Sequence, residues 1–132
     1  MYLGDYQEDY TKVNFIFATT VNGTMTALAG TPVISVFKGD STTQSTAGIT
    51  LTEGFDSNTG SNQVKIDLSA DAFYAVGEDY TVYLSAGTLD GKTVVGRPVA
   101  YFSIQNRRTE DVRNLVAGVL RRLRQVQLVP GR

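Results

Sequence analysis

The segment of residues 79–106 constrains the fold most strongly, because two strand-length stretches in it alternate between apolar and polar side chains. These stretches are residues 80–86 and 99–104, and their period of two is typical of half-buried strands. Asp90 and Gly91 lie between them. This pair favours a chain reversal, because glycine adopts a positive φ without steric cost. We therefore predict an antiparallel hairpin here and an all-β architecture.

Shorter stretches with the same character precede the hairpin. Residues 11–20 carry apolar side chains on both faces, which predicts a central strand covered on both sides. A single helical turn at residues 71–75, capped by Ser69, is expected to cross between two sheets. The acidic, tyrosine-rich residues 2–10 predict an extended arm or first strand, which either lies along its own domain or docks on a partner. Further strands are predicted at residues 32–38, 49–52 and 64–68.

Six or seven short strands at regular spacing predict an immunoglobulin-like β-sandwich. The chain has no cysteine and no tryptophan, so the disulfide and the tryptophan of antibody domains are absent. Tyr80 opens the penultimate long strand two residues before Val82, in the manner of a tyrosine corner, although β propensity alone would also place a tyrosine there. The predicted core consists of Phe15, Phe17, Val36, Ile66, Leu68, Tyr80, Val82, Leu84 and Phe102.

The charge of the chain divides it near Asn106. Of its 132 residues, the first 106 carry five Lys/Arg and eleven Asp/Glu, whereas residues 107–132 carry seven Arg and two acids. We therefore predict a sandwich domain with an N-terminal arm at residues 1–106 and a basic C-terminal α-helix at residues 107–132.

The predicted helix carries an apolar seam with intervals of four and three residues. Such a seam favours either self-association or packing against the helix's own sandwich. Its arginines face solvent more readily than nucleic acid, because no aromatic side chains are interleaved with them. The residues expected to contact an oligomer or partner are Val112, Leu115, Val116, Val119, Leu120, Leu123 and Val126.

Composition argues against catalysis. The chain has no histidine, which is the commonest general base in enzymes. It also has no cysteine, so a thiolate can serve neither as a nucleophile nor as a metal ligand. Four carboxylates, Glu53, Asp56, Asp67 and Glu78, would have to converge for acid–base chemistry, and no spacing predicts that. Residues 56–62 resemble a calcium loop only loosely, so an ordinary turn is favoured. We expect no enzyme, cofactor or metal site, and no membrane span, because no apolar run approaches about 20 residues.

Eight stretches of this chain match one known family: residues 2–5, 28–32, 35–38, 41–51, 72–75, 86–88, 94–96 and 102–107. In these stretches the chain resembles small virion proteins and N-terminal fibre domains from tailed bacteriophages. The resemblance covers residues 2–108 and implies an immunoglobulin-like domain that anchors an appendage to the particle. It also implies other virion proteins as partners and location in a virion assembled in the host cytoplasm. The valine-rich seam of the predicted helix favours a small homo-oligomer, and a trimer is favoured because it would match the symmetry common in phage appendages.

The position on the particle is left open by this resemblance. A tail, baseplate, neck or fibre adaptor is the first expectation, because only the short basic segment follows the sandwich where a longer fibre would be expected. A capsid decoration protein is an alternative. A carbohydrate- or receptor-binding module is another, and it would present aromatic side chains on one loop edge, with Tyr74, Tyr83 and Tyr101 as candidates.

Overall fold

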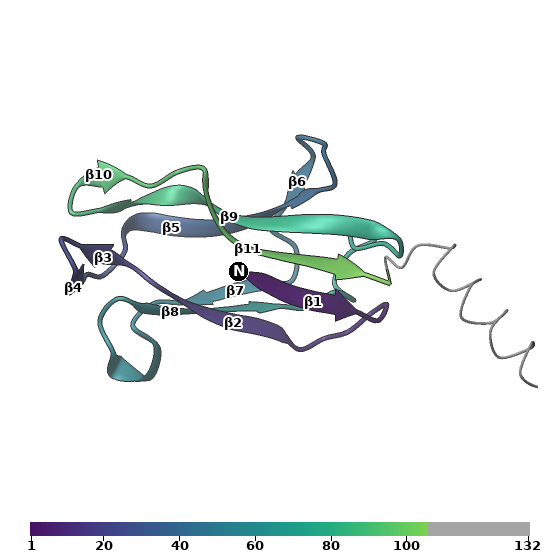
Figure 1. Ribbon diagram of the computed structural model, residues 1–132, viewed down its shortest axis with the longest axis horizontal. Helices are drawn as coiled ribbons and strands as arrows, with labels where there is room; N and C mark the ends of the chain where they lie inside the picture. The colour runs from purple at the N-terminus through teal and green to yellow at the C-terminus, as the bar shows by residue number, and fades with distance from the viewer. Residues whose placement is uncertain (106–132) are drawn as a thin grey trace, which may run out of the picture.

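The computed structural model describes residues 1–105, which form two β-sheets packed face to face (Figure 1). Sheet A has the strand order β1-β11-β9-β5-β6, and sheet B has the order β2-β8-β7. The predicted all-β sandwich is thus confirmed for this part of the chain. The predicted C-terminal helix and the boundary near Asn106 lie outside the described residues.

Seven strands of the described residues are four or more residues long, in agreement with the predicted six or seven. A three-residue 3₁₀ turn, η1, follows β7. In sheet A the strands are β1 (Tyr2–Tyr6), β5 (Ala29–Lys38), β6 (Gln44–Ser45), β9 (Glu78–Leu89), β10 (Lys92–Thr93) and β11 (Arg97–Ile104). The others are β2 (Val13–Ala18), β7 (Ile49–Thr52) and β8 (Ser61–Ile66) of sheet B, the hairpin β3 (Thr20–Val21) and β4 (Thr24–Met25), and η1 (Phe55–Ser57).

The predicted hairpin at residues 79–106 is confirmed. β9 turns back at Asp90 and Gly91, whose φ angles of 51° and 74° are both positive, and continues as the short strand β10. β11 then runs antiparallel to β9, and its Ile104 is in register with Glu78. Since β9 pairs with β5 on its other side, it is the central strand of sheet A.

The N-terminal arm lies along its own domain. β1 pairs in parallel with β11, and its Tyr6 is in register with Ile104. The Tyr6 ring stacks on Tyr10 at 5.3 Å between centroids and meets Phe102 edge-on at 6.2 Å. The arm therefore covers one side of the core. This agrees with the predicted alternative in which the arm lies along its own domain.

The hydrophobic core fills the space between the sheets. Phe17 is only partly buried, and the other eight predicted core residues are all buried. Buried residues that the prediction did not include are Val13, Leu28, Ile34, Val64, Tyr74, Leu89, Ala100 and Ile104.

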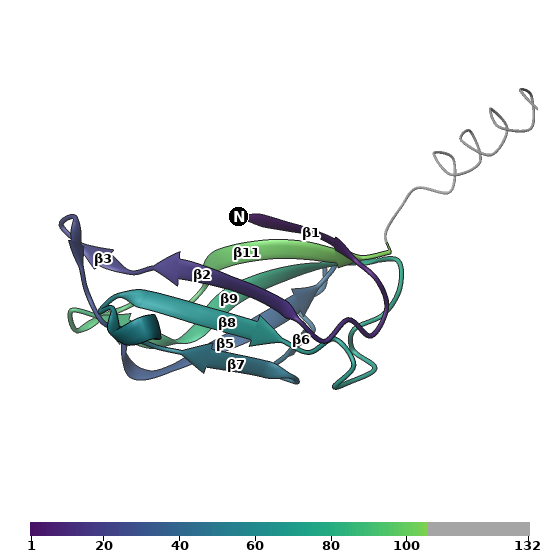
Figure 2. The same ribbon diagram turned by 90° about the horizontal axis from the view of Figure 1, so that it is seen from below.

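The prediction that β2 is a central strand is wrong. Among the described residues β2 pairs with β8 alone and forms an edge of sheet B (Figure 2). Its Asn14 and Ala18 are exposed, and 45 % of Ile16 is accessible. The physical reason is that the preceding strand, β1, joins β11 in the other sheet instead of flanking β2.

Residues 71–75 do cross from sheet B to sheet A as predicted, but they form one hydrogen-bonded turn, with Tyr74 N donating to Asp71 O at 3.2 Å, rather than a helical turn. Aspartate side chains form tight turns in this connection. The Asp67 carboxylate accepts hydrogen bonds from Ser69 Oγ at 2.6 Å and Ser69 N at 2.9 Å, which lower its pKa. Asp71 Oδ1 accepts a bond from Phe73 N at 2.7 Å. Such local side-chain bonds compete with helix formation, and Ser69 is a partner of Asp67 rather than a cap.

The tyrosine corner is confirmed. The Tyr80 ring is buried, and its Oη donates to Phe73 O at 2.9 Å and accepts from Ala75 N at 2.7 Å. Burial raises the pKa of Tyr80. The side chain thus fixes the turn that carries the chain from sheet B to sheet A.

Candidate interaction surface

The three tyrosines considered for ligand binding occupy different environments. Tyr74 is buried and donates a hydrogen bond from Oη to Ala47 O at 2.6 Å, and burial raises its pKa strongly. Tyr83 is buried as well, whereas 44 % of Tyr101 is exposed. Tyr83 and Tyr101 project from strands, so these three side chains do not form the aromatic loop edge expected of a carbohydrate-binding module.

Tyr101 belongs to a row of side chains that crosses the whole outer face of sheet A. Residues in register on neighbouring strands project to the same side of a sheet. The register joins Tyr101 to Tyr2 on β1 and to Thr81 on β9, and it continues from Thr81 into β5 and β6. In order across the sheet, the row consists of Tyr2, Tyr101, Thr81, Phe37 and Gln44.

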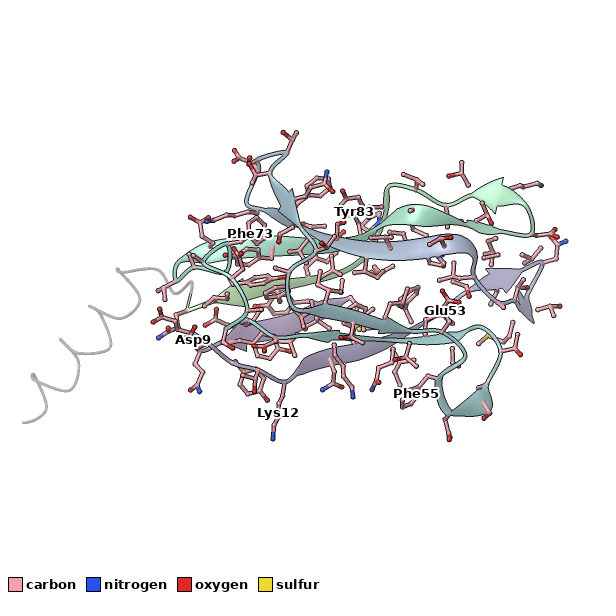
Figure 3. The ribbon with its side chains drawn as sticks, turned by 180° about the vertical axis from the view of Figure 1, so that it is seen from behind. Asp9, Lys12, Glu53, Phe55, Phe73 and Tyr83 are labelled. Carbon is pink, nitrogen blue, oxygen red and sulfur yellow. The ribbon has the colours of Figure 1, made fainter. Side chains whose placement is uncertain are left out.

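Aromatic stacking covers the centre of this face. The rings of Phe37 and Tyr83 lie 4.1 Å apart and are almost parallel, with 4° between their planes. The Tyr83 hydroxyl also bonds to Gln44 Oε1, and Ser35 Oγ donates to Ser85 Oγ at 2.7 Å. Tyr83 is therefore only 6 % exposed although it projects away from the core. Figure 3 shows Tyr83 at sheet A, remote from Lys12 and Phe55 beside sheet B.

The row carries no charged side chain. The next row contains Asp5, whose carboxylate accepts a hydrogen bond from Ser103 Oγ at 2.6 Å, and Asp79, which is in register with Ser103 on its other side. The face thus offers two exposed tyrosines, Tyr2 at 68 % and Tyr101 at 44 %, beside a fixed aromatic stack. Flat aromatic surfaces of this kind suit contact with another protein, where tyrosine contributes apolar area and a hydroxyl at its rim.

Sequence reasoning missed most of this surface. Phe37 and Ser35 alternate with the buried Ile34 and Val36, and that alternation is the signal from which their outward direction could be predicted. The contribution of Tyr2 follows only from the pairing of β1 with β11, which joins residues 99 positions apart in the chain.

The four carboxylates considered for catalysis are distributed over both ends of the sandwich. Glu53 follows β7 and Asp56 lies in η1, at one end of sheet B. Asp67 follows β8, which runs antiparallel to β7, and so lies at the other end of sheet B. Glu78 lies in sheet A, where it is in register with Ile104 of β11, and Ile104 is in turn paired with Tyr6 of β1. Within residues 1–105 there is no group of three or more His, Cys, Asp or Glu side chains that could hold a metal ion.

The remaining predicted site residues are those of the helical seam, and they lie outside the described residues: Val112, Leu115, Val116, Val119, Leu120, Leu123 and Val126. In the part of the chain that the structure describes, no helix is long and apolar enough to span a bilayer.

Comparisons with protein-family models, curated proteins and solved structures find no match to this chain.

Proposed function

We propose that this chain is a structural protein of a tailed-bacteriophage virion, in which an immunoglobulin-like sandwich attaches an appendage to the particle. The observation that carries the proposal is the strand order, because it agrees with the immunoglobulin-like sandwich that the resemblance to phage attachment domains implies. Sheet B, with β2-β8-β7, corresponds to strands B, E and D of an immunoglobulin domain. Sheet A contains the counterparts of strands G, F and C in β11, β9 and β5.

Two further features support this reading. β6 extends sheet A beside β5, as strand C′ does in variable-type domains. Tyr80, at the start of the counterpart of strand F, forms the tyrosine corner that recurs in this architecture. The correspondence concerns fold, so the attachment function rests on the resemblance and on the surface chemistry.

The row on sheet A is the face that we propose for contact with a neighbouring virion protein. Its exposed tyrosines, Tyr2 and Tyr101, resemble the residues that dominate binding energy at protein interfaces. The absence of charge along the row keeps the desolvation cost of such a contact low.

The first experiment asks whether the chain belongs to a particle. Virions of a phage that encodes the chain should contain it in a fixed copy number by mass spectrometry, and a map of the virion should contain a matching sandwich density. Virions without the chain would overturn the proposal.

The second experiment tests the contact face. Tyr101→Lys should abolish incorporation into particles, because it places a charge in the uncharged row. Thr50→Lys is the matched control, since Thr50 is exposed on β7 of sheet B. Both variants are checked for folding by near-UV circular dichroism. Equal incorporation of the two folded variants would show that sheet A is not the docking face.

The third experiment tests the helical seam in the full chain. Val116→Ser combined with Leu123→Ser should lower the subunit number in light scattering, because it removes two apolar seam positions. Asn114→Ser combined with Gln125→Ser alters the same segment outside the seam and should leave the subunit number unchanged. If both double variants keep the wild-type subunit number, the seam does not assemble the protein.

A further inference from the structure

Strand β2 is the least protected edge in the described part of the chain. Edge strands carry unpaired backbone groups, and proteins guard them with short length, bulges, charged side chains or proline. β6 has two residues, β7 has four, and β1 contains a register shift beside Gly4. β2 has six residues, pairs with β8 without any shift, and contains neither proline nor a charged residue.

β2 also exposes one large apolar side chain on the outer face of sheet B. Val13 and Phe15 are buried, but Ile16 on the opposite face is 45 % exposed and Phe17 is only partly buried. The structure supplies β8 on one side alone. Within residues 1–105, Ile16 and Phe17 are therefore apolar side chains left partly accessible beside an edge, and a strand added along β2 would cover part of them.

We propose that β2 pairs antiparallel with β2 of a second copy of this chain, with the twofold axis at Ile16. Opposed residues in such a pair project to the same face. With Ile16 opposite its own copy, Phe15 meets Phe17 on the inner face and Asn14 meets Ala18 on the outer face. In this register, residues that face the core lie opposite core-facing residues of the other copy, and outward-facing residues lie opposite outward-facing ones. The two copies of sheet B then join into one six-stranded sheet.

Charge favours a second copy as the occupant. Residues 1–106 carry eleven acids, yet none of them lies in β2, β7 or β8, and Lys65 is the one charged residue in these three strands. In the proposed register Lys12 lies opposite Thr20, so no like charges meet. Two net-acidic domains can therefore approach along this sheet, whereas other parts of their surfaces repel each other.

The expected dimer is weak. A single pair of six-residue strands covers less than the standard interface of about 1,600 Å², so pairing should occur at high local concentration, as between copies held in one assembly. This inference depends on β2 alone and stands whether or not the chain is a virion protein.

The decisive experiment uses the absence of cysteine in the chain. Opposed residues in an antiparallel pair have Cα atoms about 4.5–5.5 Å apart, a separation that a disulfide can bridge. The full-length Ile16→Cys variant should therefore form a disulfide-linked dimer in a glutathione buffer, visible on a non-reducing gel. In the first control, Asn14→Cys, the cysteines of the two copies would lie four positions out of register, about 13 Å apart. In the second control, Thr50→Cys, the cysteine lies on the exposed face of β7 and reports the rate of cross-linking by random collision.

We expect Ile16→Cys to cross-link at least about tenfold faster than both controls. Equal rates in all three variants, or a faster rate in Asn14→Cys, would overturn the pairing. Sedimentation of the full chain gives a second readout: Ile16→Lys should reduce concentration-dependent association and Thr50→Lys should not. Because both lysine variants keep the helical seam, any seam-driven association is common to them, and an identical dependence in the two variants would also overturn the proposal.

Discussion

In sheet B the pairing of β2 with β8 runs from Val13 to Ala18 without a break, whereas each long pairing of sheet A contains a register shift. Bulges increase local twist and bend a strand. The outer face of sheet A also carries side chains that cover one another, so that Tyr83 and Ser35 are buried there. The outer face of sheet B is regular and mostly polar, with Lys65, Thr50 and Ile16 exposed. The two sheets thus share one core but differ in how much their outer faces contribute to stability.

The largest effect should come from the shared core. Leu84 on the central strand β9 is fully buried, whereas Leu51 on the edge strand β7 is partly buried. Leu84→Ala should lower the free energy of unfolding by about 2–5 kcal/mol, measured by denaturant titration. The matched Leu51→Ala should cost less, about 1–2 kcal/mol, because the site is partly hydrated already. A cost below about 0.5 kcal/mol for Leu84→Ala would place that face in solvent.

The next comparison concerns the two outer faces directly. Tyr83→Ala should destabilise the protein by about 2–3 kcal/mol, since it removes a buried ring and its stacking on Phe37. Ile16→Ala, on the outer face of sheet B, should cost under about 0.5 kcal/mol in the monomer, because that side chain is already half exposed. If the two substitutions cost the same, the outer face of sheet A does not contribute the stability that its burial suggests.

The chain segment between the sheets should make stability sensitive to alkali. Burial raises the pKa of Tyr74 and of Tyr80 in the folded protein, so both phenols stay protonated there at a pH that ionises them in the unfolded chain. Their contribution is complete below pH about 10 and is lost as pH rises towards the folded-state pKa. The free energy of unfolding should fall above pH 10, by at most about 1.4 kcal/mol per pH unit for each tyrosine.

Tyr74→Phe tests the source of this alkaline sensitivity. The variant should show a shallower loss of stability above pH 10, when unfolding is followed by circular dichroism at several pH values. Tyr101→Phe is the control, because it removes an exposed phenol. An unchanged slope in Tyr74→Phe would mean that other groups cause the alkaline loss.

The sequence predicts those features that depend on neighbouring residues. The alternation in β9, the reversal at Asp90 and the tyrosine corner at Tyr80 are all set within about ten residues, and each is confirmed. The edge position of β2 could not be predicted, because it depends on which sheet the arm joins. The burial of Tyr83 could not be predicted either, since it depends on Phe37 and Gln44, which lie 46 and 39 positions away in the chain.

The candidate surface follows the same division. The outward direction of Tyr101 and Phe37 follows from strand periodicity, but their membership of one row requires the register of five strands. The seam residues from Val112 to Val126 were predicted from heptad spacing alone, and they stay a prediction.

The smallest expected effect tests the strain in sheet A. In β5 the residues from Gly30 to Pro32 lie opposite the single residue Gly87, and Thr31 has a φ of 55°. A β-branched residue in this left-handed region is strained, whereas asparagine tolerates it well. Thr31 is exposed, so its replacement removes no buried contact. Thr31→Asn should therefore raise the free energy of unfolding by about 0.5–1 kcal/mol, seen as a higher denaturant midpoint.

Thr50→Asn supplies the matched control in sheet B. Thr50 is exposed on β7, whose pairing with β8 has no register shift, so asparagine replaces a good strand former in extended backbone. This substitution should lower the stability by a few tenths of a kcal/mol. The same change would then stabilise the bulged strand and destabilise the regular one. If Thr31→Asn destabilised the protein as much as Thr50→Asn, the bulge in β5 would store no strain, and the irregularity of sheet A would be a matter of geometry without an energetic cost.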